Sequence, residues 1–185
     1  MPRKLLRGAW QLILVVSMGC GGSAPPLTAV EGDVPECVGT VAAPPPGLDR
    51  IEDPELLKDA VGEEGAGKLC EGEVFLVSSS VTVYRVWNSE AGYTLYGRWW
   101  SFELPRGPRE AYREANDICE EWSPLDVMSS CTLKVGARIV MGPGQSVQCE
   151  NGRYPKSAVN QVYIPNDSRN DVLFVEDCTP GAPWP

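Results

Sequence analysis

Arg85 is the residue whose type and setting point most directly to chemistry. It lies within residues 81–87, a run of β-branched and aromatic residues that predicts a β-strand. An unpaired guanidinium is costly to bury, so a strand arginine either faces solvent or has an anionic partner. Two interpretations stay open. Arg85 is an exposed or structural residue, paired with Glu90 or Glu103, or it grips the phosphate or carboxylate of a ligand through two hydrogen bonds.

Two adjacent tryptophans, Trp99 and Trp100, follow Gly97 closely. Neighbouring side chains on a β-strand point to opposite faces, so the two indole rings are expected to diverge. One ring is expected in the core. The other is a candidate for stacking on a flat ligand or a sugar ring, with a partly buried tryptophan that fills a packing gap as the alternative. Both tryptophans are therefore candidate ligand-binding residues.

The chain contains no histidine. This excludes Ser-His-Asp and Cys-His nucleophile pairs, histidine-ligated zinc and general-base catalysis by histidine. An enzyme with this sequence has to work with carboxylates, arginine, glutamine, tyrosine or hydroxyl groups.

The strands that must position these residues dominate the second half of the chain. Gly136, Gly142 and Gly144 lie between or after them, and we expect a hairpin at residues 136–137 and a plain turn at residues 142–145. The β-branched and aromatic runs predict strands at residues 74–77, 81–87, 93–96, 131–135, 138–141, 146–149, 161–164 and 171–176.

Two helices are predicted between the strands. The main one covers residues 108–116, because Pro108 suits the first position of a helix. A shorter one follows Asp53, a good N-cap residue, with Pro54 in its first turn. We therefore expect an α+β fold: a single disulfide-stapled domain, with an antiparallel or mixed sheet, one main helix and short helices.

The N-terminus has the pattern of a secretion signal. A basic start is followed by an apolar centre at residues 12–16 and by slim residues directly before Cys20. The apolar run is far shorter than the roughly 20 residues that a transmembrane helix needs. The pattern resembles the lipobox of bacterial lipoproteins, although Ser17 stands where that family usually has leucine. The resemblance implies cleavage after residue 19, diacylation of Cys20 and attachment to a membrane through the lipid. Ordinary secretion with a spare Cys20 is the alternative.

Residues 20–46 are rich in glycine, proline and alanine and predict a tether between the lipid and a globular domain at residues 47–185. By analogy with lipoprotein sorting, Gly21 gives no inner-membrane retention signal. We therefore expect an exported lipoprotein that is anchored at the outer membrane and faces the periplasm or the cell surface.

Six cysteines besides Cys20 are expected to form three disulfides. An even number in an exported chain is typical of a disulfide framework, and six cysteines allow fifteen pairings that spacing does not resolve. No pair has the C-x-x-C spacing of a thiolate metal site, so we expect no metal. The six are Cys37, Cys70, Cys119, Cys131, Cys149 and Cys178, and Cys37 is expected to tie the end of the tether to the domain.

The charge of the chain bears on its partners. Without residues 1–19, thirteen basic residues face 25 acidic ones, a net charge of −12. A field of this sign repels phosphate backbones and argues against binding of nucleic acid.

Four short motifs occur in a suggestive order. They are Val83-Tyr84-Arg85-Val86-Trp87, Gly97-x-Trp99-Trp100-Ser101, Thr132-Leu133-Lys134-Val135-Gly136-Ala137 with Gly142, and Gln161-Val162-Tyr163-Ile164-Pro165. This order resembles the NAD-binding core of bacterial ADP-ribosyltransferase-like toxins, and most of all their NAD-glycohydrolase branch, which has a late glutamine where transferases have glutamate. The resemblance implies that Arg85 holds the dinucleotide phosphates. It also implies that Gln161 is catalytic and orients the nicotinamide ribose, and that Trp99 or Trp100 lies beside the nicotinamide.

The chain departs from that family at several points. It has no Glu-x-Glu motif, it lacks the histidine that some glycohydrolases of this type use, and Val159 and Asn160 stand where glycines often precede the late glutamine. A shared fold without catalysis fits these departures as well as an active enzyme does. Two functions therefore stay open: an NAD-binding domain, which as an enzyme would be an NAD glycohydrolase or ADP-ribosyltransferase-like, and a non-enzymatic surface module that binds a protein or glycan through exposed aromatics.

Overall fold

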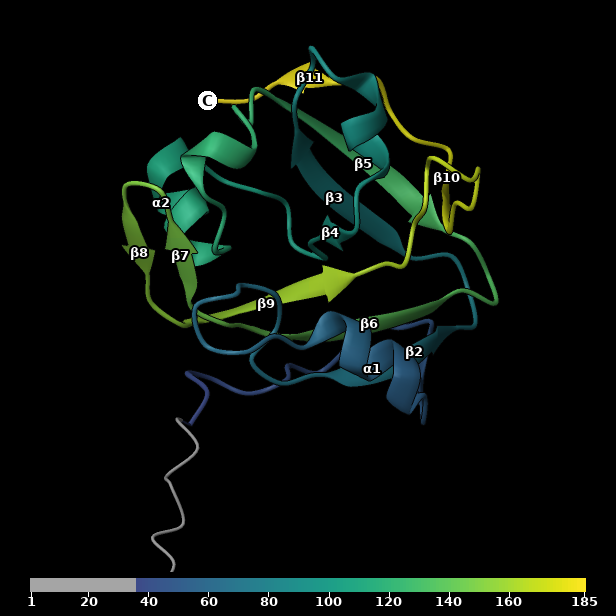
Figure 1. Ribbon diagram of the computed structural model, residues 1–185. Helices are drawn as coiled ribbons and strands as arrows, with labels where there is room; N and C mark the ends of the chain where they lie inside the picture. The colour runs from purple at the N-terminus through teal and green to yellow at the C-terminus, as the bar shows by residue number, and fades with distance from the viewer. Residues whose placement is uncertain (1–35) are drawn as a thin grey trace, which may run out of the picture. The chain divides into compact units, whose positions relative to one another are not determined.

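The computed structural model describes residues 36–185, and these residues form one compact unit (Figure 1). The predicted signal sequence, the lipidation site at Cys20 and most of the predicted tether lie outside the described residues. Residues 36–46 are part of the compact unit. Among the described residues, no helix is long and apolar enough to cross a membrane.

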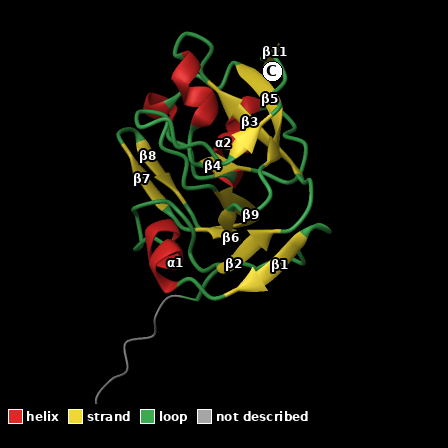
Figure 2. Ribbon diagram, turned by 90° about the vertical axis from the view of Figure 1, so that its right-hand side faces the viewer, coloured by secondary structure: helices red, strands yellow, loops and turns green. Residues whose placement is uncertain are grey.

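Two sheets form the body of this unit, and all pairs of neighbouring strands in them are antiparallel (Figures 1 and 2). The first sheet has the order β1 (Leu48–Ile51), β2 (Glu73–Val77), β6 (Arg138–Gly144), β9 (Ser157–Tyr163) and β4 (Trp99–Trp100). The second is built on β5 (Val127–Leu133), which pairs with β3 (Thr82–Trp87), β10 (Val175–Glu176) and β11 (Ala182–Pro183). A separate hairpin joins β7 (Val147–Cys149) to β8 (Gly152–Tyr154).

The described part of the chain has two α-helices, α1 (Pro54–Ala60) and α2 (Arg109–Ala115), and two 3₁₀ turns, η1 (Gly92–Tyr96) and η2 (Glu120–Trp122). The carboxylate of Asp53 accepts a hydrogen bond from the Leu56 amide at 3.1 Å and so caps α1. The α+β class is confirmed. The expectation of one main helix is wrong, because α1 and α2 both have seven residues.

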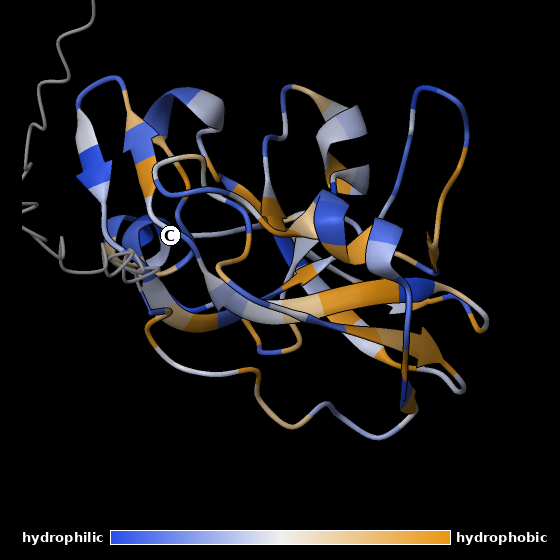
Figure 3. Cartoon of the chain, turned by 60° about the horizontal axis from the view of Figure 1, so that its bottom comes forward, coloured by the Kyte–Doolittle hydropathy of each residue, from blue (hydrophilic) through white to orange (hydrophobic). Residues whose placement is uncertain are grey.

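The core lies between the two sheets. Residues of β2 and β6 alternate between this core and the opposite face of the first sheet, which α1 covers. Phe75 and Ile139 face the core, whereas Val74 and Val140 pack with the residues around α1. Burial of each such side chain stabilises the fold by roughly 1.5–3 kcal/mol. In Figure 3 the strands carry most of the hydrophobic residues and the outer loops are largely hydrophilic.

All six expected cysteines form disulfides, with the pairing Cys37–Cys70, Cys119–Cys149 and Cys131–Cys178. The first bond ties residues 36–46 to the segment before β2, and the second ties η2 to the β7–β8 hairpin. Glu121 lies beside the Cys119–Cys149 bond. The two sulfurs of this disulfide are not thiolates, so they do not form a metal site with Glu121.

Two turn predictions are wrong. Residues 136–137 do not close a hairpin, because β5 and β6 belong to different sheets and the chain turns a corner between them. Residues 142–145 are not a plain turn, because Gly142 and Gly144 lie in β6 and are buried. A Cβ on Gly142 would lie 2.0 Å from the carbonyl oxygen of Glu71, so glycine serves close packing here.

Two strand predictions also change. Residues 93–96 belong to η1, because the Thr94 hydroxyl donates to the Ala91 carbonyl at 2.7 Å and accepts from the Asn88 amide at 3.2 Å, which closes a turn. Of residues 171–176, only the two residues of β10 form a strand.

Candidate functional site

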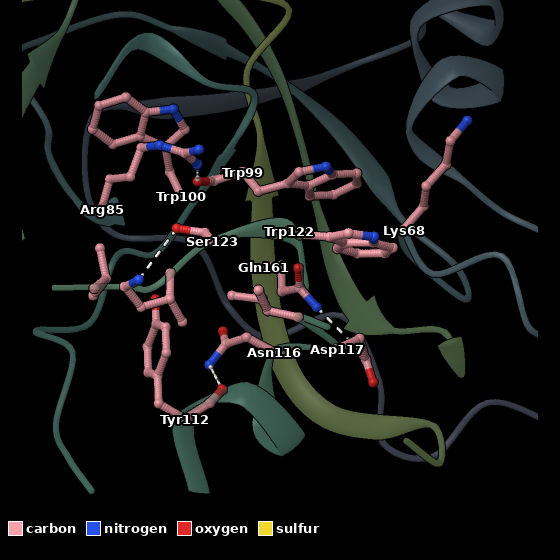
Figure 4. A pocket seen from close by; sticks show the side chains of 13 residues that line it. Lys68, Arg85, Trp99, Trp100, Tyr112, Asn116, Asp117, Trp122, Ser123 and Gln161 are labelled. Atoms are coloured by element: carbon pink, nitrogen blue, oxygen red, sulfur yellow. Dashed lines mark hydrogen bonds between the residues drawn. The ribbon is translucent and has the colours of Figure 1, made fainter. Parts of the chain in front are cut away.

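A small pocket lies where the two sheets meet the segment that follows α2 (Figure 4). Its volume is about 170 Å³, close to the ~150 Å³ of a protein cavity that holds a benzene ring. We call it the ring pocket. It is lined by Arg85 and Val86 of β3, Trp99 and Trp100 of β4, Gln161 of β9, Tyr112 of α2, and Lys68, Asn116, Asp117, Ile118, Trp122, Ser123 and Leu125 of the connecting segments.

The four candidate residues from the sequence all line this pocket: Arg85, Trp99, Trp100 and Gln161. They come from both sheets, since Arg85 lies in β3 and the other three in β4 and β9. No single strand could place them together. The site therefore depends on how the sheets pack.

Arg85 is fixed against the pocket wall. Its Nε donates to the Thr94 carbonyl at 2.8 Å, and its Nη1 donates to the Trp99 carbonyl. The guanidinium carbon lies 5.9 Å from the centre of the Trp100 ring, within range of a cation–π contact. No carboxylate within the described residues forms an ion pair with it, so pairing with Glu90 or Glu103 is not what holds Arg85. Burial lowers its pKa to about 10, and the side chain still carries its charge at neutral pH.

Gly97 makes room for this guanidinium. A Cβ at position 97 would lie 2.1 Å from Nη2 of Arg85 and 2.5 Å from its central carbon. The glycine two residues before the tryptophans is thus required by Arg85, because any side chain there would displace the guanidinium.

The two tryptophans have different surroundings. Trp100 is 3% exposed, belongs to the core between the sheets and donates from Nε1 to the Gly97 carbonyl at 2.8 Å. Trp99 is partly buried and packs against Tyr163, with 5.1 Å between the ring centres. Trp99 is therefore the member of the pair that is placed to contact a ligand.

Asp117 is the most unusual residue in the pocket. It is 3% exposed, and its Oδ1 is buried without a hydrogen-bond partner among the described residues. Its Oδ2 accepts a hydrogen bond from Nε2 of Gln161 at 3.4 Å. Gly144 packs so closely that a Cβ there would lie 2.0 Å from the same oxygen. Burial raises the pKa of Asp117 to about 7, so this carboxyl group changes charge near neutral pH.

The end of helix α2 places Asp117. The Asn116 side chain donates to the Tyr112 carbonyl at 2.9 Å, and the Ile118 amide bonds to the Arg113 carbonyl at 3.0 Å. Asp117 lies between them with φ of +54°, the left-handed conformation that ends a Schellman-type cap. Glycine usually holds this position. An aspartate two residues after a helix gives no sequence signal of burial, so Asp117 was not among the residues predicted from the sequence.

Left-handed backbone is concentrated at this site. Five non-glycine residues have positive φ within the described part of the chain, and three of them line the ring pocket: Lys68, Asp117 and Leu125. Such conformations persist only where the surrounding structure holds them, and they often occur at functional sites.

The segment that carries Asp117 and Trp122 is held from two sides. The buried guanidinium of Arg113 donates to the Cys119 carbonyl at 3.2 Å and to the Ser123 carbonyl at 2.7 Å. The Cys119–Cys149 disulfide fastens the same segment to β7. Trp122 itself is 57% exposed, and Figure 4 shows its ring on the same side of the pocket as Trp99 and Gln161.

A second cavity shares Arg85 with the ring pocket. We call it the arginine groove: it has a volume of about 430 Å³ and is polar. Arg98 and Arg169 also line it, together with the carboxylate of Asp167. Nε of Arg98 donates to the Asn166 carbonyl at 3.2 Å. Arg85 thus stands between a ring-sized pocket and a basic groove.

Comparison with protein families, with curated proteins and with solved structures found no match to this chain.

Proposed function

We propose that the domain binds NAD, with the nicotinamide in the ring pocket and the phosphates at Arg85. The site would correspond to that of ADP-ribosyltransferase-like NAD glycohydrolases. One observation carries the proposal: Arg85 and Gln161, which come from different sheets, line one pocket beside Trp99. Side chains on opposite faces of the sheets would have left the two residues apart.

The dimensions of the two cavities suit this ligand. The ring pocket, at about 170 Å³, accommodates one aromatic ring and not a whole dinucleotide. The remainder requires a polar path, and the arginine groove begins at the same Arg85. Nε and Nη1 of Arg85 donate to carbonyl groups, whereas Nη2 has no hydrogen bond to another described residue. Nη2 is thus the donor available for a phosphate oxygen.

Turnover would be hydrolysis of the bond between nicotinamide and ribose. The C1′–N bond breaks, nicotinamide leaves with the electron pair, water adds its oxygen to C1′, and one proton is released. The amide of Gln161 can orient the ribose but cannot take up that proton. Within residues 36–185, Asp117 is the one carboxylate that lines the ring pocket, and its ionised form can accept the proton.

The test measures NAD binding and NAD consumption by the purified protein. We expect thermal stabilisation by millimolar NAD that is lost in Arg85→Ala and reduced in Gln161→Ala. Exposed residues of the same types supply matched controls, Arg106→Ala and Gln148→Ala, and these variants should respond as the wild type does. The melting temperature of each variant without ligand shows whether it is folded. If folded Arg85→Ala binds NAD as the wild type does, the assignment of Arg85 is wrong.

A second function is favoured by the exposed aromatics Trp122 and Tyr93, which are 57% and 70% exposed. These side chains could form part of a surface that binds a protein or a glycan. If the protein neither binds nor consumes NAD at millimolar concentration, this second function is the better explanation.

The proposal includes export and lipid attachment at Cys20. It is supported by the basic start, the short apolar centre and the small residues before the cysteine. Mass spectrometry of the mature N-terminus tests it. A diacylated Cys20 is expected, and an unmodified Cys20 or cleavage at another residue would contradict it.

A further inference from the structure

We propose that the ring pocket selects a flat aromatic ring that carries a positive charge, with Asp117 as the counter-ion and the indoles of Trp99 and Trp122 as contact surfaces. The inference deepens the proposed function and rests on it in one respect, since it takes the ring to be the nicotinamide of NAD. That ring is a pyridinium cation in the oxidised dinucleotide and is neutral in the reduced form.

Asp117 is a buried carboxylate without a countercharge among the described residues. In the described part of the chain it forms no ion pair, its Oδ1 has no hydrogen-bond partner, and its Oδ2 has a hydrogen bond only from the neutral amide of Gln161, at 3.4 Å. A buried ionised carboxylate is costly unless a cation or several hydrogen bonds compensate it. A cationic ligand beside Asp117 would supply the missing charge.

The other charged groups around the pocket have different partners. The Lys68 amine donates to the Asp59 carbonyl at 3.0 Å, and the guanidinium groups of Arg85 and Arg113 donate to backbone carbonyls. Burial raises the pKa of Tyr112 to about 12, so this side chain is neutral. The strands packed against Asp117, β6 and β9, contribute no charged side chain to the pocket. The carboxylate is therefore free to pair with a ligand.

The aromatic walls of the pocket also favour a cation. Figure 4 shows the rings of Trp99 and Trp122 on the side of the pocket where Gln161 and Asp117 lie. The face of an indole attracts a cation, and tryptophan does so more strongly than other aromatic residues. The volume of about 170 Å³ fits a single ring. Aromatic faces together with a buried carboxylate are thus complementary to a ring that is both flat and positive.

The test compares two small probes that differ in charge. 1-Methylnicotinamide is a permanent pyridinium cation, and nicotinamide is its neutral counterpart. Calorimetric titration of the purified protein at pH 8 should show tighter binding of the cation. Only ionised Asp117 pairs with it, so a pKa of about 7 predicts that its affinity falls by up to about 90-fold from pH 8 to pH 5. The affinity for nicotinamide should change little over this range.

Asp117→Asn removes the charge and keeps the shape. We expect the binding of the cation by this variant to be independent of pH, and most of the preference for the cation to be lost, because only the indole faces then favour it. Trp122→Ala should weaken the binding of both probes. Tyr93→Ala alters an exposed aromatic residue outside the ring pocket and should leave the affinity for both probes unchanged. Equal binding of the two probes by the wild type, absence of binding by either, or a preference for the cation that is undiminished in Asp117→Asn would each overturn the inference.

These outcomes are distinct from those that test the proposed function. If the protein prefers 1-methylnicotinamide to nicotinamide but does not bind NAD, the charge-selective pocket is supported and NAD is not the ligand. If the protein binds NAD but does not distinguish the two probes, the proposed function is supported and the role of Asp117 as counter-ion is refuted.

Discussion

Asp117→Asn should change how the stability of the protein depends on pH. Burial raises the pKa of Asp117 from its ordinary value of 3.8 to about 7, a difference of about three pH units. Each unit corresponds to about 1.4 kcal/mol, so ionisation of Asp117 costs the folded state about 4 kcal/mol relative to the unfolded chain. Because the pKa is raised in the folded state, the cost is absent below about pH 4. It grows as the pH rises from about 4 to 7 and is complete above that.

Asparagine has nearly the same shape and tolerates the left-handed backbone at φ of +54°. We therefore expect Asp117→Asn and the wild type to have similar free energies of unfolding at pH 4, and the variant to be more stable by about 4 kcal/mol at pH 8. Urea denaturation at several pH values gives this difference. The matched control is Asp171→Asn, because Asp171 has φ of +56° but is exposed, and its profile should run parallel to that of the wild type. Parallel profiles for Asp117→Asn and the wild type would refute the burial of an ionisable carboxyl group at this position.

Two further predictions concern the walls of the site. Gly97→Ala should destabilise the protein by about 3 kcal/mol, because the new methyl group displaces the charged Arg85 side chain from its two hydrogen bonds. In a protein that already carries Arg85→Ala, the same change should destabilise by less than about 0.5 kcal/mol. A denaturation double-mutant cycle measures this coupling, and equal losses in both backgrounds would mean that Gly97 does not make room for Arg85. Joint replacement of Cys119 and Cys149 by alanine should cost about 4 kcal/mol of stability and weaken ligands of the ring pocket. Replacement of Cys131 and Cys178 by alanine should cost a similar amount of stability and leave the affinity for ligands of the ring pocket unchanged. If both double replacements change this affinity equally, the Cys119–Cys149 bond does not hold the pocket wall.

The sequence predicted the local features of this fold better than the way they assemble. Strand-forming runs and the Asp53 cap follow from residue types, and the even number of cysteines led to three disulfides, but spacing could not choose among the fifteen pairings. The glycines near residues 136 and 142–144 indicated turns. Gly136 instead lies at a corner between sheets, and Gly142 allows a close approach of Glu71, which only the packing reveals.

The candidate site shows the same division. Arg85 and the two tryptophans stand out by type and setting, and Gln161 followed from a resemblance in motif order. Asp117 could not be selected, because its burial results from a helix cap, the Gly144 backbone and a disulfide-fastened loop that lie far apart in the sequence. A charged residue after a helix ordinarily faces water.

The most direct test of NAD binding at this site is a crystal structure of the protein with NAD. The account predicts nicotinamide in the ring pocket against Trp99, its ribose at Gln161, and a phosphate oxygen within hydrogen-bond distance of Nη2 of Arg85. Electron density for NAD at another surface, with the ring pocket free of it, would contradict the account.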